Sequence, residues 1–304
     1  MAGPISTGNH PKALWPGVHA FVMGEYSEHP TEHTQIFDMM SSDKAYEEDV
    51  ETTGFGLAQV KTEGGSVAYD SHTQGFTKRY THVAYGLGFI VTREEMDDNL
   101  YKSRAFNRGR QLAFSFRTTK EIVAANILNR AFNSSYTGGD GKELLATDHP
   151  TLAGNFSNEL AIPADLSEAS LEDLLIQIMN AKNSRGLQIA IRGRKLIVPP
   201  ALAFTAERIM KSTLQNDTAN NAVNAVRSMG LLPDGVAVNH YLTDDDAWFI
   251  KTDTPNGLCC FNRTAFEFTR DNDFDTSNAK AKGYERYSFG WTDYRGLYGS
   301  EGAA

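Results

Sequence analysis

Residues 92–133 read TREEMDDNLYKSRAFNRGRQLAFSFRTTKEIVAANILNRAFN, and this stretch decides how the chain can fold. Thr92 and Glu95 have the spacing of a capping box, in which each side chain bonds a backbone N–H at the start of a helix. Apolar residues then recur at helical spacing as far as Phe132. A helix over 93–133 would be on the order of 60 Å long, and few compact enzymes need a single helix of that length.

The sequence before this helix alternates between apolar and polar residues. The Gly64-Gly65 pair predicts a two-residue hairpin turn between extended flanks that include Leu57, Val60, Val67 and Tyr69. Polar residues occupy both faces of these flanks, so neither face can be buried in the chain's own core. We therefore expect a projecting two-stranded loop that lies on a partner surface. Residues 83–91 alternate with period two and predict a strand that returns to the core.

The first 50 residues mix Gly, Pro, His and acids without steady periodicity, which is typical of an arm that is ordered by outside contacts. Between Glu25 and Glu51 there are nine carboxylates and one base. The candidate acidic contacts of this arm are Glu47, Glu48, Asp49 and Glu51. The sign reverses on the predicted helix, which carries six bases and no acid over one stretch: Lys102, Arg104, Arg108, Arg110, Arg117 and Lys120. We predict that these bases face another subunit or DNA; two solvated faces are the alternative.

Beyond the helix, a mixed α/β region is predicted to begin near Pro163. A helix capped by Ser170 and ended by Gly186 precedes short strands at 189–191 and 196–198, and Pro199-Pro200 opens another helix. A lesser helix at 220–228 and strands at 235–241 and 247–251 follow. The tail alternates at Phe266/Phe268 and again around Tyr287, which predicts antiparallel strands with aromatic inner faces.

Composition excludes several classes of protein. The 304 residues are 40% hydrophobic and 22% charged, which is a globular balance. No apolar run is long enough to span a bilayer, and the N-terminus does not read as a signal peptide. Cys259 and Cys260 are adjacent, so they supply neither a loop-closing disulfide nor a four-ligand zinc site. The net charge of −9 is the opposite of a sequence-reading DNA binder's.

Motifs for catalysis or metal binding are weak. The 138–143 stretch lacks the first glycine and the Ser/Thr of a phosphate-binding loop. His29 and His33 have the i, i+4 spacing of a metal pair, but Pro30 disfavours a helix at His29. Asp244 to Asp246 lack the spacing of a calcium loop, and the basic turn at 192–195 is consistent with either a contact or plain solubility. We predict no enzymatic activity, no cofactor and no metal.

The order of elements resembles the major capsid protein of tailed bacteriophages. The strings GKELL at 141–145 with His149 and Asn158, LIVPP at 196–200, DAWF at 246–249 and WTDYRG at 291–296 agree with the family in order and spacing. The resemblance implies an α+β fold with an N-terminal arm (1–53), an extended β-hairpin loop (54–82) and a long spine helix (93–133). It further implies a peripheral domain (83–164 and 246–304) and an α/β axial domain (165–245).

This resemblance also implies a function. Such a protein self-assembles from pentamers and hexamers into the icosahedral head that encloses a phage genome. The implied partners are a separate scaffolding protein, a portal, a decoration protein and packaged double-stranded DNA bound without sequence preference, with no membrane. The implied location is the virion, after assembly in the host bacterial cytoplasm. Lys61 and Lys78 are the only lysines of the loop, and since nothing marks a partner asparagine, no cross-link is predicted.

Two other functions remain open at this stage. An encapsulin-like prokaryotic nanocompartment shell protein resembles the same fold and would enclose protein cargo. A soluble α/β hydrolase or nucleotide-binding enzyme would instead be a compact monomer or dimer, in which the 54–82 segment is protected from proteolysis.

Overall fold

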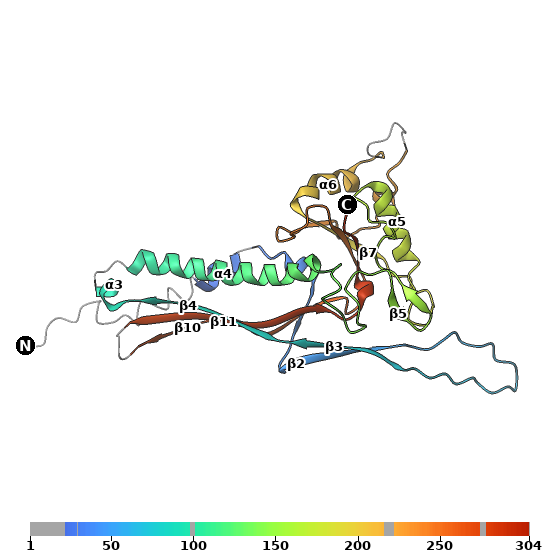
Figure 1. Ribbon diagram of the computed structural model, residues 1–304, viewed down its shortest axis with the longest axis horizontal. Coiled ribbons are helices and arrows are strands. Elements are labelled where there is room, and N and C mark those ends of the chain that lie inside the picture. Colours follow the sequence, from blue (N-terminus) through green and yellow to red (C-terminus); the bar gives the residue numbers. More distant parts are fainter. Residues whose placement is uncertain (1–21, 29, 98–100, 216–221, 274–277, 304) are drawn as a thin grey trace, which may run out of the picture.

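The computed structural model describes residues 22–28, 30–97, 101–215, 222–273 and 278–303. The chain forms an elongated body in which a long helix, α4 (Tyr101–Asn129), lies along a four-stranded sheet. A second four-stranded sheet with its own helices stands at one end of that body, and the loop of residues 53–73 projects beyond it (Figure 1). The arrangement is α+β, as expected.

The first sheet has the strand order β1-β10-β11-β4. Its members are β1 (Asp38–Ser41), β10 (Leu258–Asn272), β11 (Ala279–Trp291) and β4 (Val83–Val91). β1 runs parallel to β10, and the other neighbours are antiparallel. The strands predicted at 83–91 and in the tail are therefore present, and they join the segment before the helix to the end of the chain.

One face of this sheet is covered by α4. Leu112 and Phe116 of the helix pack against Phe266 and Phe268 of β10, and all four are buried. Gly283 of β11 lies directly beneath the ring of Phe116, where an added Cβ would come within 2.5 Å of a ring carbon. A glycine is needed at this position so that helix and sheet can approach so closely.

The helix predicted over 93–133 occupies α3 (Arg93–Asp97) and α4, and residues 98–100 lie outside the described part of the chain. As predicted, Thr92 Oγ1 accepts a hydrogen bond from the backbone N–H of Glu95, at 3.4 Å. The predicted end is wrong, because α4 stops at Asn129 and Phe132 lies in a turn. The Asn129 side chain donates to the Tyr241 carbonyl and accepts from the Thr243 N–H, which fixes the last helical turn against the second sheet's loop.

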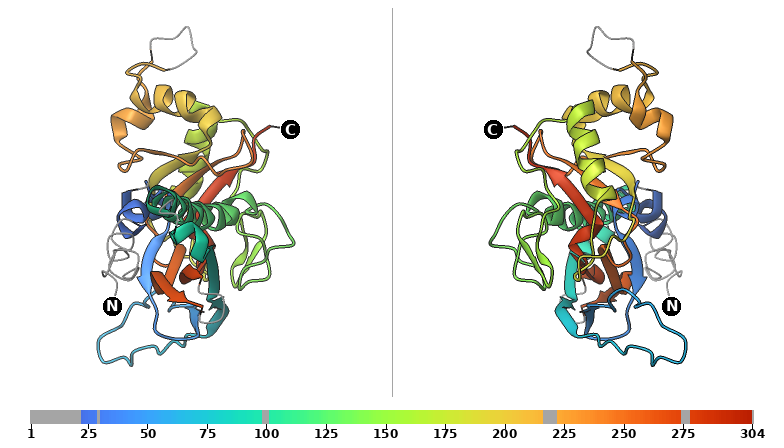
Figure 2. Two further views of the ribbon diagram at one scale, coloured as in Figure 1. Left: turned by 90° about the vertical axis from the view of Figure 1, so that its left-hand side faces the viewer. Right: turned by 90° about the vertical axis from the view of Figure 1, so that its right-hand side faces the viewer.

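The second sheet has the order β12-β9-β7-β8. Its strands are β12 (Leu297–Ser300), β9 (Trp248–Thr252), β7 (Gly193–Val198) and β8 (Val236–Val238). The helices α5 (Glu168–Met179), η2 (Pro200–Leu202), α6 (Ala203–Lys211) and α7 (Ala225–Met229) accompany it. Leu196 and Ile250 pack toward α5 and α6, whereas Ile197 and Phe249 pack toward the end of α4. Figure 2 shows this sheet between the α6 layer and α4.

Three sequence predictions in this region are wrong. The N-cap of α5 is Ser167 and not Ser170. The Ser167 hydroxyl accepts from the Ser170 N–H, and the Ser170 hydroxyl accepts from the Ser167 N–H. The helix ends at Met179, and Gly186 instead occupies a turn at a φ of 82°. Residues 189–191 form no strand, since β7 starts at Gly193.

The projecting loop rises from a two-stranded ribbon, β2 (Tyr46–Thr52) and β3 (Gln74–Thr81). A turn is present one residue earlier than the predicted Gly64-Gly65 turn: the Gly65 N–H donates to the Thr62 carbonyl, which places Glu63 and Gly64 at its centre, with Gly64 at a φ of 74°. The predicted strands at Leu57, Val60, Val67 and Tyr69 are absent, because ladder pairing ends at Thr52 and Gln74. The smaller described elements are α2 (His33–Ile36), β5 (His149–Thr151), β6 (Gly154–Phe156) and η3 (Tyr294–Gly296).

Asn158 is fully buried and joins two segments of the chain, residues 144–146 and residues 294–297. Its amide nitrogen donates to the carbonyls of Leu144, Tyr294 and Leu297 at 2.8–3.1 Å, and its oxygen accepts from the Ala146 N–H. His149, also fully buried, approaches the same oxygen with Nε2 at 3.1 Å and Asp140 with Nδ1 at 2.6 Å. The Asn158 side chain gives a partner to each of these buried backbone groups, of which the Tyr294 carbonyl also accepts from the Leu297 N–H, and this explains why a polar residue lies here.

We expect Asn158→Ala to lower the free energy of unfolding by at least about 3 kcal/mol, because several buried backbone groups lose their only side-chain partner. The matched control is Asn155→Ala on the exposed β6 turn, for which about 0.5 kcal/mol or less is expected. Urea unfolding of both variants measures the difference. Equal free energies of unfolding for the two variants would show that Asn158 does not hold residues 144–146 and 294–297 together.

Candidate assembly surfaces

The loop of residues 53–73 carries large apolar side chains into solvent. Val60 and Tyr69 are 95% and 96% exposed, and Phe55, Leu57 and Val67 are also exposed. A single subunit therefore displays an apolar segment that it cannot bury itself. Monomeric proteins seldom expose such contiguous apolar surface unless another molecule covers it.

Hydrogen bonds hold the base of the loop in place, whereas the residues beyond the base form no strand ladder. Thr53 and Thr73 bond each other through backbone and hydroxyl groups at 3.0–3.2 Å. Asp70 accepts from the Gly56 N–H and from Arg185, which lies after α5, at 2.8 and 2.7 Å. The backbone bonds from Gly56 and Ser71, with the nearby charge of Arg185, hold the pKa of Asp70 below its usual range. The direction of the loop is thus set by a contact with the second sheet's region.

The candidate acidic contacts lie on the ribbon below the loop. Glu47 accepts from Ser42 and pairs with Lys44, and Glu48 pairs with Arg79 across the ribbon at 2.7 Å. Glu51 accepts from Ser184 at 2.6 Å and lies 3.6 Å from Arg295, while Asp49 faces Lys78 in the register. These acids already bind partners in their own chain, and a contact with another subunit remains a prediction.

The candidate bases of the helix separate into two environments. Arg108 pairs with Glu95 and Arg110 with Glu25 near the surface, at 3.0 and 2.7 Å. Arg117 and Lys120 are each 8% exposed and lie on the side of α4 that is covered by other parts of the chain. The side chains of Lys102 and Arg104 lie outside the described part. A contact of these six bases with a subunit or with DNA is likewise still a prediction.

Arg117 and Lys120 meet a buried carboxylate that the sequence did not mark. Lys120 donates to Asn262 at 3.0 Å and lies 3.9 Å from Glu285, which also accepts from the Tyr26 hydroxyl. Arg117 lies 5.3 Å from the centre of the Tyr26 ring. Burial raises the pKa of Glu285, and Lys120 opposes that rise. Glu285 lies two residues before Tyr287 and is buried like it, but the predicted alternation included only the aromatic residues and did not identify this carboxylate.

The segment before β1 is fastened by two histidine–carboxylate pairs. Glu121 of α4 accepts from the backbone N–H of His33 and contacts its Nδ1, at 2.9 and 2.6 Å. Glu32 accepts from the His240 N–H and contacts its Nδ1 at 2.9 and 2.6 Å. Burial alone would raise the pKa of Glu121, but the hydrogen bonds and charge of His33 outweigh it and hold the pKa below its usual range. The arm segment is thereby attached to both α4 and the loop after β8.

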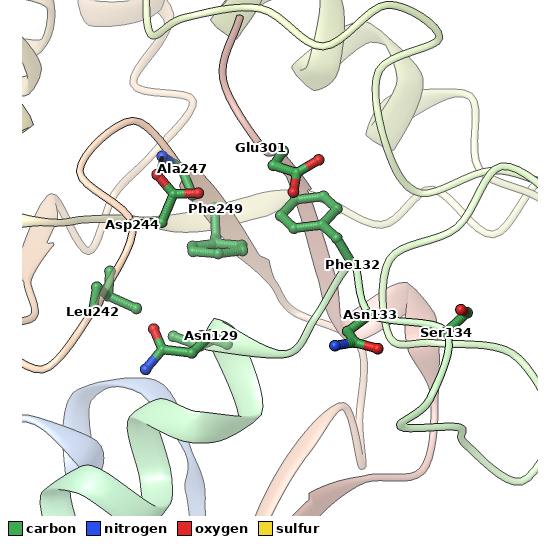
Figure 3. Close-up of a pocket in the computed structure, with 10 residues that line it drawn as sticks. Asn129, Phe132, Asn133, Ser134, Leu242, Asp244, Ala247, Phe249 and Glu301 are labelled. Atoms are coloured by element: carbon green, nitrogen blue, oxygen red, sulfur yellow. Dashed lines mark hydrogen bonds between the residues drawn. The ribbon is translucent and has the colours of Figure 1, made fainter. Parts of the chain in front are cut away.

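A pocket of about 380 Å³ lies where α4 ends. Figure 3 shows the rings of Phe132 and Phe249 in its centre, with Asp244 and Glu301 on one side and Asn129 and Asn133 on the other. Asp244 also accepts from the N–H groups of Asp246 and Ala247, which makes 244–247 a self-capped turn. The described lining residues include no histidine, cysteine or cation.

The other motifs have structural roles among the described residues. In the 138–143 turn, the Gly138 N–H donates to Lys142 O, and Lys142 pairs with Asp148. His33 is held by Glu121, while His29 lies outside the described part. No group of three or more His, Cys, Asp or Glu side chains that could hold a metal ion occurs in the described ranges. Within those ranges, no helix is both long and apolar enough to cross a membrane.

Comparisons with known proteins agree with this architecture. Residues 75–300 match the family described as phage capsid protein. The capsid of a native GTA particle has a TM-score of 0.57 at 11% identity, covering 91% of this chain and 92% of that one. The mature capsid of bacteriophage PhiM1 gives 0.56 at 11%, covering 89% and 86%. The virus-like particle from Pyrococcus furiosus gives 0.54 at 12%, covering 94% and 98%. No curated protein matches.

The family match identifies a structural protein that assembles with copies of itself into a shell. The family match covers residues 75–300, which is about three quarters of the chain, and the chain belongs to the phage capsid protein family. Its place is the capsid of the virion. The low identities to the solved capsids establish the shared fold alone.

The Glu121 contacts predict a definite dependence on pH. Since folding lowers the pKa of Glu121, its stabilisation is complete above the pKa of the unfolded carboxyl, about 4.3, and is lost as the pH falls through the folded value. We expect Glu121→Gln to lower the free energy of unfolding by about 1.5 to 3 kcal/mol at pH 7. The loss should shrink as the pH falls through the lowered pKa of the folded state, because the wild-type carboxyl is then neutral as well.

Urea unfolding at several pH values measures this difference. Glu267→Gln, on an exposed position of β10, is the control and should change little at any pH. A deficit of Glu121→Gln that stays the same from pH 7 down to the most acidic pH at which the protein is folded would contradict an electrostatic role.

Proposed function

We propose that the chain is the major capsid protein of a tailed phage and forms the icosahedral head around double-stranded DNA. The observation that supports this most is the loop of residues 53–73, whose apolar side chains have no place to be buried in one subunit. Burying them against a neighbour gains roughly 25 cal/mol per Å² of apolar surface and drives association. The family match supplies the kind of assembly.

The proposal divides the chain by task. Residues 1–53 are an arm that crosses to a neighbouring subunit, and 54–82 are the extended loop. Residues 83–164 and 246–304 form a peripheral domain around the spine helix, and 165–245 form an axial domain that meets its copies in pentamers and hexamers. The independent helix layer on the second sheet supports a separate axial unit.

The same proposal names further partners. A separate scaffolding protein guides assembly in the host bacterial cytoplasm, a portal occupies one vertex, and a decoration protein can add to the outside. DNA contacts are non-specific, because a chain with a net charge of −9 must meet phosphates through local bases such as Arg108 and Arg110. Alanine at both positions should shorten or reduce the packaged genome while leaving the shell intact.

A nanocompartment shell is the second candidate, since the virus-like particle from Pyrococcus furiosus shares the fold over nearly its whole length. The two functions differ in the contents of the particle. Nuclease-protected DNA in purified particles favours the phage head, and a single enclosed protein favours the compartment.

The loop can be removed without disturbing its base, which gives a direct test. Because Thr53 and Thr73 already pair, residues 54–72 can be replaced by Asn-Gly, which forms a two-residue turn. We expect this variant to unfold at the wild-type temperature within a few degrees but to form no particles in light scattering. Lys61→Ala is the control, because it removes one loop charge and keeps the apolar surface. Particles formed by the loop-deleted chain would contradict the proposed role of the loop.

A further inference from the structure

One aromatic side chain of the second sheet's region is left in water. Phe204, in the first turn of α6, is 81% exposed. Glu207 lies three residues later, on the same side of the helix, and pairs with the exposed Lys211. Phe204 and Glu207, which we call the knob, form an exposed pair of an aromatic ring beside a carboxylate. Burying such an apolar ring stabilises a protein, and a single chain leaves this ring exposed.

A pocket of about 640 Å³ in the same region has the opposite character. Leu175 and Met179 of α5, with Ile191, Met229 and Leu231, give it apolar walls. Met229 is 66% exposed and Met179 42%, so two flexible side chains stand at the opening. Methionine adapts its shape to an incoming group, and this makes it common at binding surfaces.

Two arginines complete the pocket. Arg194 pairs with Asp234 through both carboxylate oxygens, at 3.1 and 3.3 Å. Arg192 is exposed, and its backbone N–H, rather than its guanidinium, donates to Asp253. We call this the methionine pocket. Its lining also includes Asp253, which is held by the Arg192 backbone, so the pocket presents apolar walls beside the exposed guanidinium of Arg192.

Phe204 and the methionine pocket lie at different ends of β7. The pocket includes Gly193, where β7 begins, whereas α6 follows the end of the strand at Val198. The six residues of β7 span roughly 20 Å. Figure 1 shows α6 and the end of α5 on different sides of this region. The exposure of Phe204 confirms that it does not occupy the pocket of its own chain.

We propose that Phe204 of one subunit enters the methionine pocket of a second copy, where Glu207 faces Arg192. The inference rests on the proposed function and specifies one contact of the axial ring. A knob on one end and a pocket on the other make a head-to-tail contact, and head-to-tail contacts that close produce rings. The aromatic ring meets apolar walls and the carboxylate meets an arginine, so shape and charge agree in the same orientation.

Cysteine cross-linking of the full chain tests the contact. In Phe204→Cys with Met229→Cys, each subunit carries one thiol on the knob and one at the pocket, so oxidised particles should give a ladder that ends at five or six subunits. The native Cys259 and Cys260 are buried, and burial raises the pKa of their thiols to about 11 and about 12, so they should not react.

Phe204→Cys with Ile162→Cys is the matched control, because Ile162 is as exposed as Phe204 but lies outside the pocket. It should give no ladder beyond the level of the single variants. Particles of the pocket pair without a ladder overturn the inference and leave the proposed function standing. A wild-type chain that forms no particle or ring, alone or with a scaffold, overturns the proposed function and this contact with it.

A charge exchange covers the case in which the cysteine pair does not assemble. Glu207→Arg and Arg192→Glu should each reduce the yield of particles, and the double variant should restore it. A loss of particle yield that is equal in the single and double variants would count against the contact. Single variants that assemble with the wild-type yield would also count against it.

Discussion

The burial of one face of α4 is the constraint on which the rest of the structure depends. Leu112 and Phe116 cover the first sheet, and Leu128, farther along the same helix, packs against the core of the second sheet. One helix of 29 residues, about 43 Å, therefore runs through two hydrophobic cores. Because the helix is rigid, it fixes the distance and direction between the two sheets. A subunit of that shape is suited to span a shell surface, and it leaves the loop and the arm as extensions for neighbours.

Polar groups in the interior fix the parts of the chain that the helix does not reach. Asn158 satisfies backbone groups from both halves, Glu121 holds the segment at His33, and Arg185 sets the direction of the loop through Asp70. Each contact joins residues distant in sequence and leaves unsatisfied groups if it is removed. The subunit thus presents its apolar loop in one orientation before any neighbour binds. Such preorganisation lowers the entropic cost of association.

Much of this architecture could be predicted from the sequence. The helix start at Thr92, the strand at 83–91, the turn at Gly64 and the aromatic tail strands follow from local chemistry, namely caps, periodicity and glycine. The end of α4 could not be predicted, because the contacts of Asn129 with the 241–243 loop override a stripe that continues to Phe132. The alternation of the loop flanks predicted strands, but among the described residues these flanks pair with no strand. The buried pairings of Arg117, Lys120 and Glu285 depend on packing between segments far apart in sequence, which no local pattern encodes.

The most direct measurement of the central claim is a cryo-electron microscopy reconstruction of the particles formed by the full chain. The account predicts a closed shell with five-fold vertices, in which residues 53–73 of each subunit lie against a neighbour and Val60 and Tyr69 are buried there. A chain that remains a monomer or dimer under assembly conditions, or a shell in which this loop stays in solvent, would contradict it.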